Sequence, residues 1–292
     1  MNKQPRLAPA PLAFRKMHGA GNDFVIVDQR QGAMPLTPAL VRALGDRHCG
    51  IGFDQLAVLE VAADADLAVT YYNADGTTSA ACGNATRCIA ALLDAEGAGP
   101  QIRIAVTGRG LLTAERLADG RYAVDMGAPA ADWQAVPLAQ AADLDALPLP
   151  DAPSAVGMGN PHCVHFLDTL DGLDWQARGA AVEHDPLFPE RTNVHFVTLA
   201  GPDRLVARVW ERGVGRTLAS GSSACAIGVA AHRRGLTGRR VAIEMEGGTL
   251  EVDWRDDGRV RLTGPIAHVF DGTIPAEVIA GLTAEVDAEV TA

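Results

Sequence analysis

The stretch that decides the fold runs Tyr72-Asn-Ala-Asp-Gly-Thr-Thr-Ser-Ala-Ala-Cys82-Gly83-Asn84-Ala-Thr-Arg-Cys-Ile89. It follows a β-like run at residues 67–72 and leads into an apolar run at helical spacing, residues 89–93. A glycine directly after a cysteine lets the backbone approach a ligand closely. The N-terminus of the helix that follows favours a thiolate. We therefore expect Cys82 to be a reactive thiol with a pKa below the ordinary value of about 8.5.

The same pattern occurs a second time, 138 residues further along and without a gap. Ala81-Cys82-Gly83 aligns with Ala219-Ser220-Gly221, and Gly19-Ala-Gly-Asn22 aligns with Gly157-Met-Gly-Asn160. Further aligned pairs are Gln55 with Asn193, Asn73 with Glu211, Tyr72 with Trp210 and Ile89 with Ile227. Two copies are too few for a solenoid, so the repeat predicts two similar domains that face each other.

Strand-like runs outnumber helical ones in both copies, with about two helices expected in each. This predicts an α+β fold of two pseudo-symmetric domains from an internal duplication, each a curved β-sheet or barrel around a helix. We place the N-terminal domain at residues 12–128 and the C-terminal domain at residues 129–274, with tails at 1–11 and 275–292. Residues 18–23 are expected to form a loop before a strand at 24–27.

Composition excludes several classes of function. The chain has 292 residues, of which 48% are hydrophobic and 21% charged, as expected for a globular protein with a full core. Its net charge of −11 argues against nucleic acid or an anionic membrane as partner. No apolar run approaches the roughly 18 residues of a spanning helix, and residues 1–11 lack the apolar region of a signal peptide. Five cysteines without a Cys-x-x-Cys pair argue against a disulfide scaffold or zinc site, and indicate a cytoplasmic protein.

Cys82 and Ser220 would lie on opposite faces of one substrate if the two domains face each other. Such a pair can remove a proton from one side of a carbon and return one on the other. The alternative for Cys82 is a small buried hydrophobic residue, which its polar neighbours argue against. Cys88 and Cys225 lie within apolar helical runs and are expected to be structural, and burial is also favoured for Cys49 and Cys163.

Polar side chains at strand-to-loop junctions form a second set of candidates. Four asparagines (Asn22, Asn73, Asn160 and Asn193) occupy such junctions, where turn chemistry alone could explain them. Paired by the repeat, they instead indicate amides around a polar ligand. Glu211 and Arg212 follow an apolar strand, and could hold the ammonium and the carboxylate of an amino acid or form a surface ion pair. His162 is the histidine kept as a candidate, because it follows Asn160-Pro161 in the repeated loop.

The motifs together resemble those of diaminopimelate epimerase. They are His18-Gly-Ala-Gly-Asn-Asp-Phe24, Asn73-Ala-Asp-Gly76, Ala81-Cys-Gly-Asn-Ala-Thr-Arg-Cys88, Gly159-Asn-Pro-His162, Arg191-Thr-Asn193 and Trp210-Glu-Arg-Gly-Val-Gly215, in order over residues 14–273. The resemblance implies interconversion of LL- and meso-diaminopimelate for lysine and peptidoglycan synthesis, without a cofactor or metal. It also implies two cysteines as base and acid, domains that close on substrate, and a homodimer.

The resemblance carries roles onto particular positions. Cys82 matches the first cysteine, and His162 and Glu211 match groups that support catalysis. The matched substrate-binding positions are Asn22, Gln55, Asn73, Gly83, Asn84, Asn160, Asn193, Glu211, Arg212, Gly221 and Ser222.

Ser220 departs from the family pattern, which has cysteine in the second Ala-Cys-Gly motif. A hydroxyl is far less acidic than a thiol and is a poor base unless a neighbour activates it. Ser220 is then either an introduced replacement that traps an inactive enzyme or a natural variant with altered chemistry. The alternatives to epimerisation are a single-base lyase, such as a dehydratase, or a catalytically silent amino-acid binder on the same scaffold.

Overall fold

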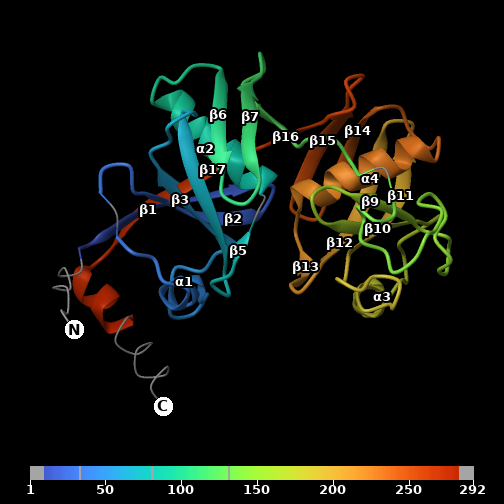
Figure 1. Ribbon diagram of the computed structural model, residues 1–292, viewed down its shortest axis with the longest axis horizontal. Coiled ribbons are helices and arrows are strands. Elements are labelled where there is room, and N and C mark those ends of the chain that lie inside the picture. Colours follow the sequence, from blue (N-terminus) through green and yellow to red (C-terminus); the bar gives the residue numbers. More distant parts are fainter. Residues whose placement is uncertain (1–9, 33, 80–81, 131, 283–292) are drawn as a thin grey trace.

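The computed structural model describes residues 10–32, 34–79, 82–130 and 132–282. They form two lobes side by side, each with a curved sheet against one long helix (Figure 1). Ala81 of the first motif and most of both predicted tails lie outside the described residues. No helix in the described ranges is long and apolar enough to cross a membrane.

The two halves of the chain contain corresponding elements in the same order. The first half comprises β1 (Leu12–Gly19), β2 (Asn22–Asp28), α1 (Pro38–Gly45), β3 (Gln55–Glu60), β4 (Leu67–Asn73), β5 (Thr78–Ser79), α2 (Gly83–Ala95), β6 (Gln101–Val106), β7 (Gly110–Arg116) and β8 (Tyr122–Asp125). The second comprises β9 (Ser154–Gly157), β10 (Pro161–Phe166), α3 (Trp175–Glu183), β11 (Asn193–Gly201), β12 (Arg204–Glu211), β13 (Gly215–Thr217), α4 (Gly221–Arg233), β14 (Arg240–Met245), β15 (Gly248–Trp254) and β16 (Val260–Gly264), followed by β17 (Ala267–Ile274).

Strand pairing repeats as well. In the first half β1–β2 is antiparallel, β2–β3 parallel, β3–β4 antiparallel and β4–β6 parallel. In the second half β9–β10, β10–β11, β11–β12 and β12–β14 show the same directions in the same order. The α+β class and the duplicated architecture are thereby confirmed.

Each sheet curls around the helix that follows the central motif. Ile89 of α2 and Ile227 of α4 are equivalent in the repeat and fully buried. Burying such a side chain stabilises the fold by about 1.5–3 kcal/mol relative to exposure. The smaller helices, α1 and α3, lie at the same end of the two lobes (Figure 1). Thr37 caps α1 by accepting from the N–H of Leu40, with a proline at the first position as the sequence indicates.

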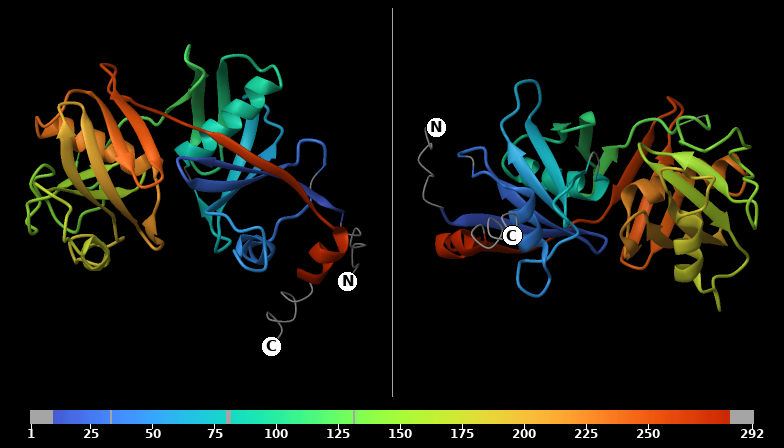
Figure 2. Two further views of the ribbon diagram at one scale, coloured as in Figure 1. Left: turned by 180° about the vertical axis from the view of Figure 1, so that it is seen from behind. Right: turned by 60° about the horizontal axis from the view of Figure 1, so that its bottom comes forward.

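The last strand corrects one expectation. We placed residues 267–274 at the end of the C-terminal domain, but β17 pairs antiparallel with β1 in the N-terminal lobe. Figure 2 shows it running back across the molecule. Residues 276–282, expected as tail, are helical, and Ile279 is buried beside the α1 core. The boundary at residues 128/129 stays a prediction.

Residues 18–23 form a hairpin and not a loop. β1 and β2 pair up to Gly19 and Asn22, and Ala20 and Gly21 make the turn with φ of 53° and 82°. Positive φ at both central residues is typical of the tight turns that join twisted strands. This turn holds Asn22 at the start of β2.

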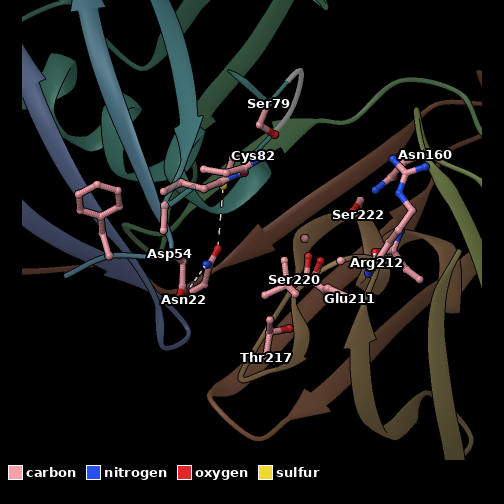
Figure 3. A pocket seen from close by; sticks show the side chains of 18 of the residues that line it. Asn22, Asp54, Ser79, Cys82, Asn160, Glu211, Arg212, Thr217, Ser220 and Ser222 are labelled. Carbon is pink, nitrogen blue, oxygen red and sulfur yellow. Dashed lines mark hydrogen bonds between the residues drawn. The ribbon is translucent and has the colours of Figure 1, made fainter. Parts of the chain in front are cut away.

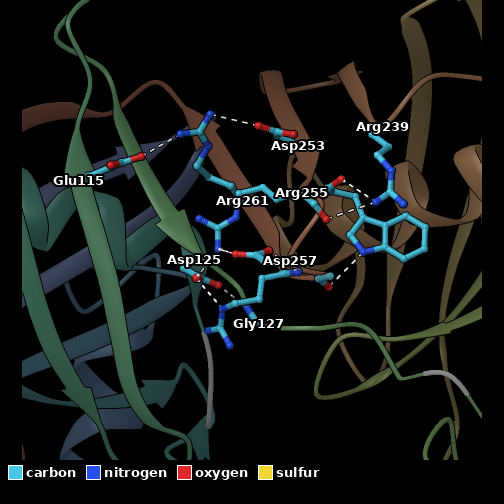
Figure 4. A network of polar contacts seen from close by, with 11 residues as sticks. Glu115, Asp125, Gly127, Arg239, Asp253, Arg255, Asp257 and Arg261 are labelled. Carbon is cyan, nitrogen blue, oxygen red and sulfur yellow. Dashed lines mark hydrogen bonds and ion pairs between the residues drawn. The ribbon is translucent and has the colours of Figure 1, made fainter.

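Ion pairs connect the lobes where β8 meets β16 (Figure 4). Asp125 accepts from Arg255 Nη2 at 3.0 Å and from Arg259 Nε at 2.7 Å. Nearby, Arg261 Nη1 donates to Glu115 at 2.9 Å. These contacts join residues more than 120 positions apart, and so fix the lobes to each other at the junction.

Candidate active site

A cavity of about 610 Å³ lies between the lobes, within the range usual for small-molecule sites. Both halves contribute to its walls (Figure 3). The predicted site residues that line it are Asn22, Gln55, Asn73, Cys82, Gly83, Asn160, Asn193, Glu211, Arg212, Ser220, Gly221 and Ser222. The structure thus brings together nearly all of the predicted set, whose roles remain predictions.

Cys82 is the N-cap of α2, with extended backbone at φ −151° and ψ 93°. Its Sγ accepts from the N–H of Ala85 at 3.4 Å, and the thiol contacts Asn22 Oδ1 at 3.9 Å. The sulfur therefore lies at the helix N-terminus, as the sequence predicts, and faces the cavity.

The expected low pKa of Cys82 needs correction. Burial raises the pKa of this thiol to about 12, and the Ala85 N–H and the Arg87 guanidinium only partly oppose the rise. Glu211, across the cavity, raises it further. In this substrate-free structure the loss of hydration outweighs the helix terminus, so Cys82 is a thiol at neutral pH.

Ser220 occupies the equivalent N-cap of α4, but its hydroxyl makes no capping hydrogen bond. It lies instead beside the Glu211 carboxyl group at the end of β12 (Figure 3). Burial raises the pKa of Glu211, while Thr217 and Ser220 oppose the rise and the Asp54 charge adds to it. The cavity wall formed by the C-terminal lobe, here called the second wall, therefore presents a hydroxyl next to a carboxyl group. This carboxyl group accepts a proton more readily than an exposed glutamate does.

The first residues of the two helices, Gly83 and Gly221, lie against each other. A Cβ at Gly221 would be 3.6 Å from Gly83 Cα, and a Cβ at either glycine would meet the same Leu262 Cδ2, at 3.0 and 2.8 Å. Only glycine fits both positions without displacing Leu262. Two helix N-termini consequently point at one region, which favours an anion there.

On the cavity wall formed by the N-terminal lobe, the first wall, side-chain amide groups form hydrogen bonds with one another and with Asp54. Asn22 Nδ2 donates to Asp54 Oδ2 at 2.7 Å, and Asn84 Nδ2 donates to Asn22 Oδ1 at 3.0 Å. Asn84 was predicted to bind substrate, but it is buried behind the wall and positions Asn22. Gln55 Nε2 donates to Asn73 Oδ1 at 3.0 Å, so these two amides orient each other.

On the second wall, Asn193 holds two backbone segments in place. Its Nδ2 donates to the Pro161 carbonyl at 2.8 Å, and its Oδ1 accepts from the Arg212 N–H at 3.0 Å. The Arg212 guanidinium donates to the Glu190 carbonyl at 3.0 Å. In the described part of the chain, no carboxylate forms an ion pair with Arg212, so the surface-pair alternative does not hold.

His162, expected near the chemistry, does not line the cavity. Its ring is 0% exposed, with Nε2 2.8 Å from Asn160 Oδ1 and Nδ1 2.9 Å from His195 Nε2. Burial lowers the pKa of His162 to about 3, with Arg212 adding to the effect. The neutral ring is thus placed to orient Asn160 and does not face a substrate.

Sequence reasoning missed several lining residues, among them Arg47, Asp54, Ser79 and Thr217. Ser79 and Thr217 are themselves 138 residues apart, so the repeat contained the signal for this pair of hydroxyls. Asp54 adjoins Gln55 in a glycine-rich loop, and burial raises its pKa. Nothing in the sequence marks Arg47, which donates to Asp54 Oδ1 at 2.7 Å. Within the described ranges, no three His, Cys, Asp or Glu side chains are grouped to hold a metal ion.

The family model for diaminopimelate epimerase matches residues 14–131 and 154–269. The chain belongs to this family, and is therefore an enzyme of an isomerase family. It is 49% identical to the diaminopimelate epimerase of Acidiphilium cryptum, over 93% of this chain and 99% of that one. It is 47% identical to the enzyme of Rhodospirillum centenum, over 92% and 94%.

Solved structures show the fold shared more widely. A hydroxyproline epimerase from Agrobacterium vitis matches with a TM-score of 0.64 at 16% identity, over 92% of both chains. A phenazine biosynthesis protein from Bacillus anthracis matches with a TM-score of 0.66 at 14% identity, over 90% of this chain and 99% of that one. At these identities the likeness concerns the fold alone.

Proposed function

We propose that this protein interconverts LL- and meso-diaminopimelate by moving a proton at one α-carbon, without a cofactor. The observation that carries the proposal is the equivalent placement of Cys82 and Ser220, each the N-cap of a helix on one wall of the same cavity. A substrate carbon between them has one proton-handling group on each face. The family relationship supplies the substrate.

The charges of the cavity complement this substrate. Diaminopimelate carries two ammonium and two carboxylate groups at neutral pH. Asp54 and Glu211 offer carboxyl groups for the ammonium groups. Arg212 and the facing N-termini of α2 and α4 offer positive ends for the carboxylates.

In the proposed reaction, each wall of the cavity supplies one group that transfers a proton. One group takes the α-hydrogen as a proton, the bonding electrons stay on the substrate as a carbanion, and the group on the other face returns a proton. Cys82 must be a thiolate to act as base, and the ammonium groups of a bound substrate would lower its pKa by opposite charge. On the other face, Ser220 passes a proton between the substrate and Glu211.

The second candidate is a single-base lyase or a silent amino-acid binder. It is favoured by one observation, the hydroxyl of Ser220 at a position where the family pattern has a thiol. A lyase needs one base and a leaving group on the neighbouring carbon, which diaminopimelate lacks.

Incubation of the purified protein with LL-diaminopimelate, followed by chiral separation, tests the proposal. Formation of the meso isomer that is lost in Cys82→Ala supports it. If LL-diaminopimelate binds but remains unchanged, the binder alternative replaces it. Loss of water from 3-hydroxyproline, whose hydroxyl is on the carbon next to the α-carbon, would indicate the lyase.

We further propose a cytoplasmic homodimer, on the strength of the family resemblance. β17 exposes Val269 and Phe270 on the N-terminal lobe, an apolar surface suited to a contact between subunits. Light scattering that gives the mass of one chain would contradict the dimer.

A further inference from the structure

Arg87 is a buried cation in the second turn of α2, with 0% exposure. Its Nη2 donates to Asn84 Oδ1 at 2.9 Å, and its Nη1 lies 3.5 Å from the Gly83 carbonyl. Its Nε has no hydrogen-bond partner within the described ranges. An arginine stays protonated even when buried, so a full positive charge lies beneath the cavity wall.

No carboxylate of the described residues neutralises this charge. Among the described residues, the anionic groups that act on Arg87 are the thiols of Cys82, Cys88 and Cys225, each only if ionised. A buried charge without a partner costs several kcal/mol. An anion bound nearby would offset part of this cost through its attraction to the buried charge.

The space around the guanidinium is kept open by glycine. A Cβ at Gly264 would be 2.9 Å from Arg87 Nη2, and a Cβ at Gly19 would be 3.1 Å from the same atom. These glycines belong to β16 and β1, so three separate elements enclose the group.

Polar contacts lead from Arg87 to the cavity. Arg87 donates to Asn84, Asn84 donates to Asn22, and Asn22 Oδ1 lies 3.9 Å from Cys82 Sγ. Asn84, which Arg87 contacts, lies in the first turn of α2, where the N-termini of α2 and α4 meet. The guanidinium therefore adds a whole charge to the partial positive charges of two helix ends.

We propose that Arg87 is a positioning residue whose charge, acting through Asn84 and the α2 N-terminus, attracts and stabilises the anionic part of the ligand between Gly83 and Gly221. The inference rests on the proposed function for the identity of that ligand. It assigns the anion preference of the site to a residue that no ligand touches.

Alkylation of Cys82 by two reagents of similar size tests the proposal without an activity assay. Iodoacetate is an anion and iodoacetamide is neutral, and both need the same thiolate. The ratio of their rates at Cys82 therefore cancels the ionised fraction and reports the local potential. Mass mapping separates Cys82 from the exposed Cys49.

We expect Arg87→Met to lower the iodoacetate-to-iodoacetamide ratio about tenfold, equivalent to about 1.4 kcal/mol. Arg87→Lys should restore most of the ratio because the charge returns. Arg204→Met is the matched control, since Arg204 is exposed on β12 and pairs with Glu244, and it should leave the ratio unchanged. Should Arg87→Met not fold, Arg87→Gln takes its place. An equal ratio in wild type, the neutral variant and Arg87→Lys overturns the proposal.

Calorimetry of meso-diaminopimelate with the same variants separates this inference from the proposed function. Weaker binding in the neutral variant, restored in Arg87→Lys, supports the role of the charge even if Cys82 resists both reagents. Unlabelled Cys82 contradicts its assignment as the reactive thiol, and leaves the calorimetric result to decide on Arg87. Equal affinities in all variants overturn the inference. Absence of binding in every protein, wild type included, contradicts the proposed substrate and leaves the alkylation ratio to decide on Arg87.

Discussion

The Glu211 carboxyl group lies beside the Ser220 hydroxyl, on the wall of the cavity opposite Cys82. The two walls thus differ in chemistry although the repeat makes their positions equivalent. One wall has a thiol that also caps its helix, and the other has a hydroxyl turned away from its cap position toward a carboxyl group. The two faces of a bound substrate should therefore exchange protons at different rates.

Replacing Ser220 by cysteine should raise the rate of net epimerisation by about 10²–10⁴-fold, the usual contribution of a well-matched acid or base. The thiol is the more acidic group and would act on the second face without help from Glu211. Chiral separation of the products measures the gain. Ser222→Cys places a thiol elsewhere on the same wall and serves as the control. An equal gain in both variants would contradict the account.

Cys82 should react slowly with iodoacetamide at neutral pH in the substrate-free protein. Burial raises its pKa to about 12, so the thiolate fraction, and with it the rate, should still be rising above pH 10. The alkylation rate of a free cysteine would level off above about pH 8.5. Rate profiles against pH with mass mapping measure this. A plateau for Cys82 below pH 8 would restore the low pKa that the sequence indicates.

Arg212→Ala should weaken binding of diaminopimelate by about 2–5 kcal/mol, since it removes a cation from a desolvated contact with carboxylate. Arg216→Ala is the matched control, because Arg216 lies on the same hairpin and pairs with Glu246 outside the cavity. Isothermal titration measures both. Equal affinities of the two variants would place Arg212 outside the binding site.

Protein stability should fall below about pH 6.5 because buried histidines stay neutral in the fold. Burial lowers the pKa of His162 to about 3 and also lowers that of His195, where the nearby His162 and His165 add to the effect. The unfolded chain binds protons first as pH falls, so this stability is complete above pH 6.5 and is lost toward pH 3. For His162 the loss amounts to about 2 kcal/mol by pH 5, and His195 adds to it in the same direction.

Urea unfolding at pH 7, 6 and 5 measures the effect. His195→Gln should flatten the dependence on pH, whatever its effect on stability at pH 7. His48→Gln changes an exposed ring and should keep the wild-type slope. Parallel slopes in all three proteins would contradict the assignment.

The repeat made most of the fold and the cavity wall predictable. An offset of 138 residues places Gly83 opposite Gly221 and Asn73 opposite Glu211, and the structure brings these positions together at one cavity. The repeat did not predict that β17 belongs to the N-terminal lobe, because β17 has no counterpart in the first copy. Its pairing with β1 depends on contacts between distant segments.

The sequence did not predict how deeply the site residues are buried. Cys82 lies at a helix N-terminus, as the sequence predicts. Its pKa is nevertheless raised, because the loss of hydration outweighs the effect of the helix N-terminus. His162 was found through its motif, but pairing of β10 with β11 buries it beside His195. Residue type indicates what a group can do, whereas packing decides whether it meets the substrate.

The most direct test of the central claim is exchange of the α-hydrogen in heavy water, followed by NMR with LL- and meso-diaminopimelate separately. With a thiol on one face and a hydroxyl on the other, we predict much faster exchange from one isomer than from the other, with configuration largely retained and slow net epimerisation. Equal and rapid exchange from both isomers would contradict the account, because Ser220 would then be a full partner to Cys82.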